Sequence, residues 1–206
     1  MKIKIIEKLR NLEKDSQFKF TEDINILVGK NGSGKSTLLN ALRGKFQGIS
    51  DNNWDLHSDD CYKLSLGIKI ENFPEKEFFI SKHDDPKVQL DASSFVEKGG
   101  LELRYKSEGE KFFDIFKVNL VKAIEYSTTN KEEVLFVADE IDSHFDIATQ
   151  IMFLRMITNT AKKYAVKFII VTHHVGVIIK INCFELENSK ITVINGLDYY
   201  SKFLNT

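Results

Sequence analysis

The sequence predicts an α/β fold with a mostly parallel central sheet that is covered by helices on both faces. Three observations predict it. Residues 24–28 form an apolar, β-branched run that enters a glycine-rich turn, and the helical pattern that follows is predicted to end at Gly44. Two more runs, residues 134–138 and 166–171, are uninterrupted in the way typical of buried parallel strands. Helical patterns alternate with these strands, the clearest of them over residues 108–126.

Ahead of the glycine-rich turn, two short segments predict an antiparallel β layer next to the main sheet. Residues 2–9 mix isoleucine with charged residues in partial alternation, which is typical of an edge strand. Phe18 and Phe20 alternate with polar neighbours and predict a hairpin partner for that strand. We interpret both phenylalanines as core residues in preference to the alternative, a ring that stacks on a purine.

The middle of the chain predicts a β-hairpin followed by a reduced helical lobe. Apolar residues alternate before Pro74 and again after it, so residues 62–82 are predicted to form the hairpin. Residues 83–126 combine a charged, glycine-containing connector with the helix described above, and together they form the small lobe.

The remaining patterns complete a single domain over residues 1–206. In the helix over 108–126, large apolar residues recur every four positions and give it one apolar face. Residues 184–186 and 191–194 predict a closing hairpin. The helix that precedes the strand over 166–171 is predicted to have an apolar stripe made of Ile147, Ile151, Leu154 and Ala161.

Composition excludes several classes of function. The 206 residues include 29 basic and 30 acidic side chains, and at a pI near 6.5 no overall field draws the chain to nucleic acid or to an anionic membrane. The N-terminus lacks the long apolar stretch of a signal peptide, and no segment approaches the roughly 20 apolar residues of a membrane helix. Cys61 and Cys183 lack metal-site spacing and are predicted to be reduced thiols of a cytoplasmic protein.

The glycine-rich turn matches the phosphate-binding pattern G-x-x-x-x-G-K-[ST], with the strand and helix on either side that this pattern requires. Its glycines allow backbone N–H groups to converge on an anion, and the helix N-terminus adds unpaired N–H groups. Lys35 is predicted to reach the β- and γ-phosphates, and the Ser36 hydroxyl to ligate Mg²⁺. The alternative is a glycine-rich turn that only precedes a helix. The sequence thus predicts a P-loop NTPase whose nucleotide-binding residues are Gly29, Lys30, Asn31, Gly32, Ser33, Gly34, Lys35, Ser36 and Thr37.

Two acidic residues follow the buried run over 134–138, at the strand end that faces the ligand crevice in open α/β sheets. Because Mg²⁺ keeps several waters, one carboxylate beside Ser36 and the phosphates suffices, and Asp139 suits that role. Glu140 is then placed to polarise the attacking water in an in-line phosphoryl transfer. The alternative is an acidic loop that only caps the strand.

With these motifs the chain resembles the ABC-type ATPases. In that family the Walker B Asp-Glu pair is followed by a D-loop of Ser-x-Leu-Asp form, which Ser143 and Asp146 match with phenylalanine in place of leucine. A switch histidine closes the next strand in the family, and His173 matches it, which implies a contact with the γ-phosphate. Its neighbour His174 raises the alternative of a two-histidine metal site, but adjacent side chains of a strand point to opposite faces.

The resemblance also implies a signature segment of Ser-Gly-Gly-Gln form, at a helix N-terminus that contacts the nucleotide of another subunit. Ser107, Gly109 and Glu110 match it, with a second glutamate, Glu108, in place of the first glycine. The same Ser-x-x-Glu pattern is a capping box, and both readings are compatible. Glutamates near a phosphate are unfavourable unless Mg²⁺ or basic groups compensate them. By chain order the family's metal-contacting glutamine is Gln89, although it lies unusually close to the signature.

Within the family the chain looks closer to the RecF, SMC and OLD-like heads than to transporter subunits, because its lobe is small and Ile141 replaces the proline that transporters have after Walker B. The resemblance implies a minimal ATPase head that uses ATP and Mg²⁺ and forms an ATP-dependent homodimer around two nucleotides. Its implied setting is DNA repair, phage biology or antiphage defence with a separate effector, and net charge gives DNA binding no support. The alternatives are the ATP-binding subunit of a membrane transporter and a nucleotide-binding regulator with negligible turnover.

Overall fold

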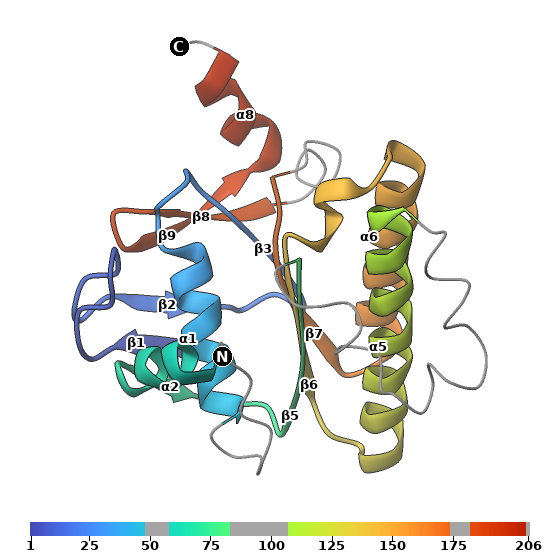
Figure 1. Cartoon of the computed structure of the whole chain (residues 1–206), viewed down its shortest axis with the longest axis horizontal. Coiled ribbons are helices and arrows are strands. Elements are labelled where there is room, and N and C mark those ends of the chain that lie inside the picture. Colours follow the sequence, from blue (N-terminus) through green and yellow to red (C-terminus); the bar gives the residue numbers. More distant parts are fainter. Residues whose placement is uncertain (48–57, 83–106, 174–181, 205–206) are drawn as a thin grey trace.

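The structure, a computed structural model, describes residues 1–47, 58–82, 107–173 and 182–204. Its centre is a six-stranded sheet (Figure 1). In spatial order the strands are β5 (Lys76–Ser81), β6 (Val134–Asp139), β7 (Val166–Val171), β3 (Ile24–Val28), β8 (Asn182–Glu187) and β9 (Lys190–Asn195). The first five run parallel, and β9 pairs antiparallel with β8, so the predicted mostly parallel sheet is confirmed.

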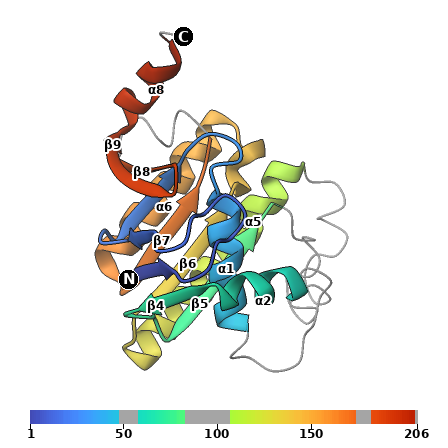
Figure 2. The same ribbon diagram turned by 90° about the vertical axis from the view of Figure 1, so that its left-hand side faces the viewer.

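Helices cover both faces of this sheet. α5 (Glu108–Asn130) and α6 (Ile147–Lys163) lie on one face, whereas α1 (Lys35–Gln47), with α2 (Ser58–Leu66) beside it, lies on the other (Figures 1 and 2). Strand side chains alternate between the two layers: Phe136 packs in the layer of α5 and α6, and its neighbours Leu135 and Val137 pack in the layer of α1. Because both faces are covered, all six residues of β6 are buried, which explains the uninterrupted apolar run.

The predicted N-terminal antiparallel layer is confirmed, with one correction. β1 (Lys2–Ile5) pairs with β2 (Gln17–Lys19), as predicted, but it also pairs with β4 (Ile68–Glu71) in the order β2-β1-β4. The edge-strand interpretation of the first segment is therefore wrong, because a third strand arrives from a distant part of the sequence. Phe18 and Phe20 are buried core residues, and Phe20 packs against Phe184 with ring centroids 6.0 Å apart.

The predicted β-hairpin over residues 62–82 is wrong. The segment instead contains the end of α2, then β4 in the small sheet, and then β5, which runs parallel to β6 in the main sheet. The apolar residues at the start of this segment suit both the two-residue period of a strand and the 3.6-residue period of a helix. Cys61 and Leu64 are buried on one helical face, whereas Tyr62 and Leu66 are 46% and 54% exposed. Packing of that face against α1 decides in favour of the helix.

Gly44 does not end α1, contrary to the prediction, and the helix continues to Gln47. A side chain at this position would collide with the backbone carbonyl of Cys61 in α2. Glycine therefore lets the two helices approach closely, and its role is in helix packing.

The two helices on the opposite face agree with the predicted positions, but not with every predicted contact. α5 contains the expected helix over 108–126 and extends it to Asn130. The buried residues of α6 are offset by one position from the predicted stripe, because Ile147 and Ile151 are 76% and 44% exposed. Leu154 and Ala161 pack at the margin of the core, and the buried positions are Gln150, Phe153, Ile157 and Thr160. Residues 83–106 of the predicted lobe lie outside the described residues.

The C-terminal part contains the predicted closing hairpin, formed by β8 and β9. It is followed by α8 (Gly196–Leu204), which the sequence did not predict and which extends from one end of the molecule (Figure 1). Both cysteines are buried thiols that are not joined in a disulfide. No helix in the described ranges is long and apolar enough to cross a lipid bilayer.

Candidate nucleotide site

The predicted phosphate loop joins β3 to α1 at the carboxyl edge of the parallel sheet (Figure 1). Gly29, Gly32 and Gly34 have φ angles of 151°, 80° and 105°, in the left-handed region that favours glycine. A Cβ on Gly29 would lie 2.6 Å from the Leu186 carbonyl oxygen, and a Cβ on Gly34 would lie 2.5 Å from a Leu12 methyl carbon. The loop is thus tightly enclosed, and the first turn of α1 adds N–H groups without helical partners beside it.

Lys35 is the first residue of α1, and only 5% of it is exposed. Its ammonium group donates hydrogen bonds to the carbonyl oxygens of Gly29 at 2.8 Å and Lys30 at 3.1 Å, so the side chain folds back across the loop. Burial lowers the pKa of Lys35, and the charges of Glu140 and Asp139 oppose this shift. The lysine therefore lies within electrostatic reach of both predicted acidic residues.

Two segments that the sequence did not connect with the site support the loop. The Asn11 side chain donates a hydrogen bond to the Gly32 carbonyl oxygen. Ser189, in the turn between β8 and β9, accepts a hydrogen bond from the Glu13 N–H at 2.8 Å and donates one to the Asn11 carbonyl oxygen at 3.1 Å. The closing hairpin therefore holds the segment around Asn11 against the phosphate loop.

The donors that a magnesium–nucleotide complex needs are present at this end of the sheet. Ser36 is exposed in the first turn of α1, Thr37 behind it is buried, and Asp139 is buried at the end of β6. The buried Ser33 hydroxyl makes no hydrogen bond within the described part of the chain, so it has capacity left for a ligand. A hydroxyl and one carboxylate, with water, are ligands that Mg²⁺ favours. The residues therefore fit Mg²⁺ and a nucleoside triphosphate.

Three neighbouring strands bring the candidate catalytic residues together. Ser81, Asp139 and Val171 are paired across β5, β6 and β7, so the residues after them leave the sheet side by side. Glu140 has a left-handed backbone, with φ of 52°, and its N–H donates a hydrogen bond to the Val171 carbonyl oxygen at 3.0 Å. Nε2 of His173 lies 3.1 Å from one oxygen of the Glu140 carboxylate.

The other oxygen of the Glu140 carboxylate accepts a hydrogen bond from the ammonium group of Lys82. The hydrogen bond with His173, reinforced by Lys82, lowers the pKa of Glu140 from 4.5 to about 2 against the opposing effect of burial. Sequence reasoning did not connect Lys82 with the site, although the structure brings it into contact with Glu140. The available signal was a lysine directly after the segment from Glu77 to Ser81, but the assignment of that segment to a hairpin removed Lys82 from the parallel sheet.

The predicted D-loop residues form the short 3-10 helix η2 (Ile141–His144) and the start of α6. Asp142 is buried and accepts a hydrogen bond from the Thr172 hydroxyl, which ties η2 to the residue before His173. Asp146 caps α6, because its carboxylate accepts a hydrogen bond from the Thr149 N–H at 2.7 Å. The Ser143 hydroxyl is buried and has no hydrogen-bond partner among the described residues.

The predicted signature residues form the N-terminus of α5, and the capping-box reading is confirmed. The Ser107 hydroxyl accepts a hydrogen bond from the Glu110 N–H at 3.3 Å, and the Glu110 carboxylate accepts one from the Ser107 N–H at 2.8 Å. Gly109 is buried against η2, where a side chain would collide with the His144 carbonyl group. The Glu108 carboxylate lies 3.3 Å from Nε2 of His144. Both glutamates therefore have partners within their own subunit.

The predicted site residues fall into two groups. One gathers at the phosphate loop and the strand ends, and the other surrounds η2 and the start of α5. Gln89 and His174 lie outside the described residues. Within the described ranges, no three His, Cys, Asp or Glu side chains form a cluster suited to a metal ion. The first group contains Lys35, Ser36, Asp139, Glu140 and His173, and the second contains Ser107, Gly109, Glu110, Ser143 and Asp146.

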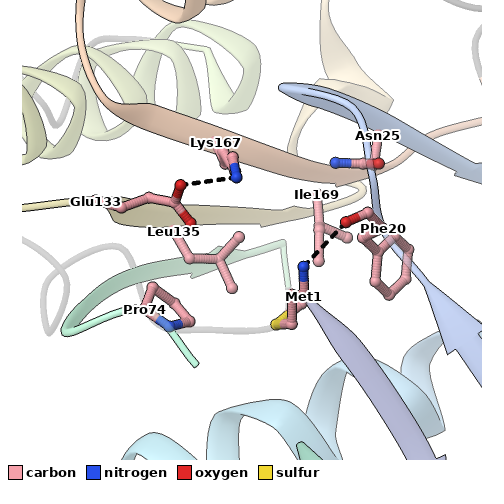
Figure 3. Close-up of a pocket in the computed structure, with 8 residues that line it drawn as sticks. All are labelled: Met1, Phe20, Asn25, Pro74, Glu133, Leu135, Lys167 and Ile169. Atoms are coloured by element: carbon pink, nitrogen blue, oxygen red, sulfur yellow. Dashed lines mark hydrogen bonds and ion pairs between the residues drawn. The ribbon is translucent and has the colours of Figure 1, made fainter. Parts of the chain in front are cut away.

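A small hollow lies at the opposite, amino edge of the sheet (Figure 3). In it the N-terminal amine donates a hydrogen bond to the Phe20 carbonyl oxygen at 3.1 Å, and Lys167 pairs with Glu133 at 2.7 Å. It shares no residue with the phosphate loop, and so it is separate from the candidate nucleotide site. The lining residues are Met1, Phe20, Asn25, Pro74, Glu133, Leu135, Lys167 and Ile169.

Comparisons with known proteins agree with this fold. A family model described as an AAA domain matches residues 3–165, and no curated protein matches the chain significantly. Stu0660 of Streptococcus thermophilus is similar in structure, with a TM-score of 0.58 and 12% identity over 98% of this chain and 78% of that one. The structure of cbiO1 from Clostridium perfringens, part of the ABC transporter complex cbiONQ, is also similar. Its TM-score is 0.56, with 17% identity over 98% of this chain and 91% of that one. A third similar structure is the SMC head domain from Thermotoga maritima, with a TM-score of 0.55 and 16% identity over 94% of this chain and 97% of that one.

Proposed function

Because this chain belongs to the AAA domain family and has the P-loop fold of ABC-type and SMC ATPase heads, we propose that it binds and hydrolyses ATP and that ATP drives its dimerisation. One observation carries the proposal: Lys82, Glu140 and His173 meet at the ends of three parallel strands, at the edge where the phosphate loop lies. A carboxylate held by a histidine, within electrostatic reach of the phosphate-loop lysine, is suited to orient water for in-line attack.

We assign nucleotide binding to the phosphate loop and the first turn of α1. Backbone N–H groups of the loop cradle the phosphates, and Lys35 exchanges its two carbonyl partners for phosphate oxygens. Ser36 and Asp139 would hold Mg²⁺, which supplies positive charge to the phosphates when bound. Because Lys35 is almost fully buried, its charge is little screened by solvent at this position.

Hydrolysis depends on Glu140 and His173. Glu140 orients a water molecule and accepts its proton, while His173 contacts the γ-phosphate. Each carboxylate oxygen has two acceptor sites, so Glu140 keeps capacity for the water while Lys82 and His173 hold it.

The group around η2 is assigned to the nucleotide of a second subunit. The start of α5 offers a helix N-terminus to an anion, and the Ser107 hydroxyl, which donates a hydrogen bond to the Glu110 carboxylate at 2.8 Å, would exchange that acceptor for the anion. Gly109 permits close packing of α5 on η2. Ser143 and Asp146 follow in the adjoining D-loop. The negative charge that would oppose such a contact is partly engaged already, because Glu108 pairs with His144 and Glu110 caps its own helix. Two such composite sites close a head-to-tail dimer with two-fold symmetry.

Glu140→Gln tests this proposal. The amide keeps the shape of the side chain but accepts a proton poorly, so kcat for ATP should fall by about a hundredfold or more, with ATP affinity changed by less than about threefold. Without hydrolysis the variant should accumulate as an ATP-bound dimer, measured by solution mass with ATP and Mg²⁺.

The matched control is Glu133→Gln, which removes a glutamate of another ion pair at the opposite edge of the same sheet. It should leave turnover within about twofold of wild type. A Glu140→Gln variant that turns over ATP at the wild-type rate would contradict the assignment. Wild-type protein that binds ATP with negligible turnover would instead support the regulator alternative.

The biological setting is the finer part of the proposal: a minimal head that acts in DNA repair, phage biology or antiphage defence through a separate effector. It is supported by the likeness to an SMC head domain over 97% of that domain's length. The transporter alternative draws on cbiO1, which is part of a transporter complex, and copurified membrane proteins would favour it. DNA binding through phosphates would weaken steeply as salt rises, and salt-independent binding would argue against that mode.

A further inference from the structure

Lys82 makes two hydrogen bonds in the site, one through its backbone and one through its side chain. It directly follows β5, and its backbone N–H donates a hydrogen bond to the Asp139 carbonyl oxygen at 3.1 Å, which continues the pairing of β5 with β6. Its side chain is 28% exposed and reaches the Glu140 carboxylate, which is 18% exposed. The position of the lysine is thus set by the sheet, and its ammonium group is directed at Glu140.

The backbone of Glu140 is also paired, because its N–H donates a hydrogen bond to the Val171 carbonyl oxygen at 3.0 Å, but the residue leaves the regular strand conformation. Its left-handed conformation ends the strand and begins η2, so the regular alternation of strand side chains no longer fixes where the carboxylate points. Two side chains fix it instead: Lys82 from the β5 side and His173 from the β7 side. His173 is the more exposed partner, at 43%.

We propose that Lys82 is a positioning residue for hydrolysis, which holds the Glu140 carboxylate at the angle needed to orient the attacking water. The inference rests on the proposed role of Glu140. Without Lys82 the carboxylate would have one exposed partner and would sample several rotamers. Because a displacement of about 1 Å in a catalytic group can cost about a hundredfold in rate, the loss of this contact should appear in kcat.

Lys82→Met tests the proposal, because methionine keeps most of the apolar stem and removes the charge. We expect kcat for ATP to fall by about tenfold or more while the KM for ATP changes by less than about threefold. Lys82→Arg, which can still donate to the carboxylate, should recover at least about a third of the wild-type rate. The matched control is Lys167→Met, which breaks the ion pair with Glu133 at the other edge of the sheet and should leave kcat within about twofold of wild type.

A second measurement needs neither nucleotide nor turnover. Thermal unfolding of Lys82→Met, Glu140→Gln and the double variant, without ATP, reports the coupling between the two side chains. We expect the double variant to lower the midpoint by less than the sum of the two single shifts, because both changes remove the same charge–charge interaction. Additive shifts would show that the contact does not form and would overturn the proposal.

The two tests separate this inference from the proposed function. If wild-type protein hydrolyses ATP and Lys82→Met has an unchanged or higher kcat, Lys82 does not position Glu140, and only this inference fails. If the wild type does not hydrolyse ATP, the proposed function fails, and the positioning role in hydrolysis falls with it. A coupled unfolding shift would then show only that Lys82 and Glu140 are in contact.

Discussion

Glu140 combines a left-handed backbone conformation with a lowered side-chain pKa. Its left-handed φ of 52° places the carboxylate between a lysine and a histidine from the two neighbouring strands. A non-glycine residue in this region is uncommon and persists where surrounding contacts hold it. Here those contacts are the hydrogen bond from its N–H to β7 and the two side-chain partners. The strained residue and the proposed catalytic residue are therefore the same one.

The pKa of Glu140 makes a prediction about stability. Because the hydrogen bond with His173 and the contact with Lys82 lower this pKa from 4.5 to about 2, the folded state favours the carboxylate over the protonated acid. The resulting stabilisation is complete above about pH 5 and is lost as the pH falls through 4.5 toward about 2. Over this range the thermal midpoint of the wild type should fall more steeply than that of Glu140→Gln, which has no carboxyl group to titrate there. Parallel curves would contradict the linkage.

The packing of α1 on α2 depends on one glycine. Helix propensity alone would make Gly44→Ala stabilising by about 0.5–1 kcal/mol. In α1, however, the added Cβ would collide with the Cys61 carbonyl group, and overpacking of this kind costs about 1–3 kcal/mol. The second effect is larger, so we expect Gly44→Ala to lower the free energy of unfolding.

Denaturant unfolding at equilibrium measures this change. Lys45→Ala, at the next residue of the same helix, is the control and should change the free energy of unfolding by less than about 0.5 kcal/mol. A Gly44→Ala protein more stable than wild type would show that α2 adjusts without cost, and the close approach would then not require glycine.

Sequence reasoning predicted the elements whose patterns are local. The phosphate loop and the Asp139–Glu140 pair are contiguous motifs beside buried strands, and the capping box of α5 spans four residues. The wrong predictions arise where contacts with distant segments decide the secondary structure or bring two residues together. Alternating residues around Leu64 suit a strand or a helix, and only packing against α1 selects the helix. Lys82 was missed for the same reason, since its partner Glu140 is brought near only by the pairing of β5 with β6.

The arrangement of the whole chain places both halves of the proposed composite site at one end. The phosphate loop, η2 and the start of α5 lie toward the same edge of the sheet in Figure 1. α8 also contributes there, because the Tyr200 hydroxyl donates a hydrogen bond to the His173 carbonyl oxygen at 3.1 Å. Two copies facing each other at this edge would let the start of α5 in one meet the phosphate loop of the other.

Mixing two inactive variants tests this arrangement most directly. Glu140→Gln removes hydrolysis from its own phosphate loop but keeps the signature segment, whereas Ser107→Arg blocks the signature and keeps the phosphate loop. In a head-to-tail dimer of one of each, one of the two sites combines an intact phosphate loop with an intact signature. We predict that each variant alone is nearly inactive and that an equal mixture, combined before ATP is added, recovers up to about a quarter of the wild-type rate, since about half of random pairs are mixed and each has one intact site. A mixture no faster than the mean of the two variants would contradict the composite site.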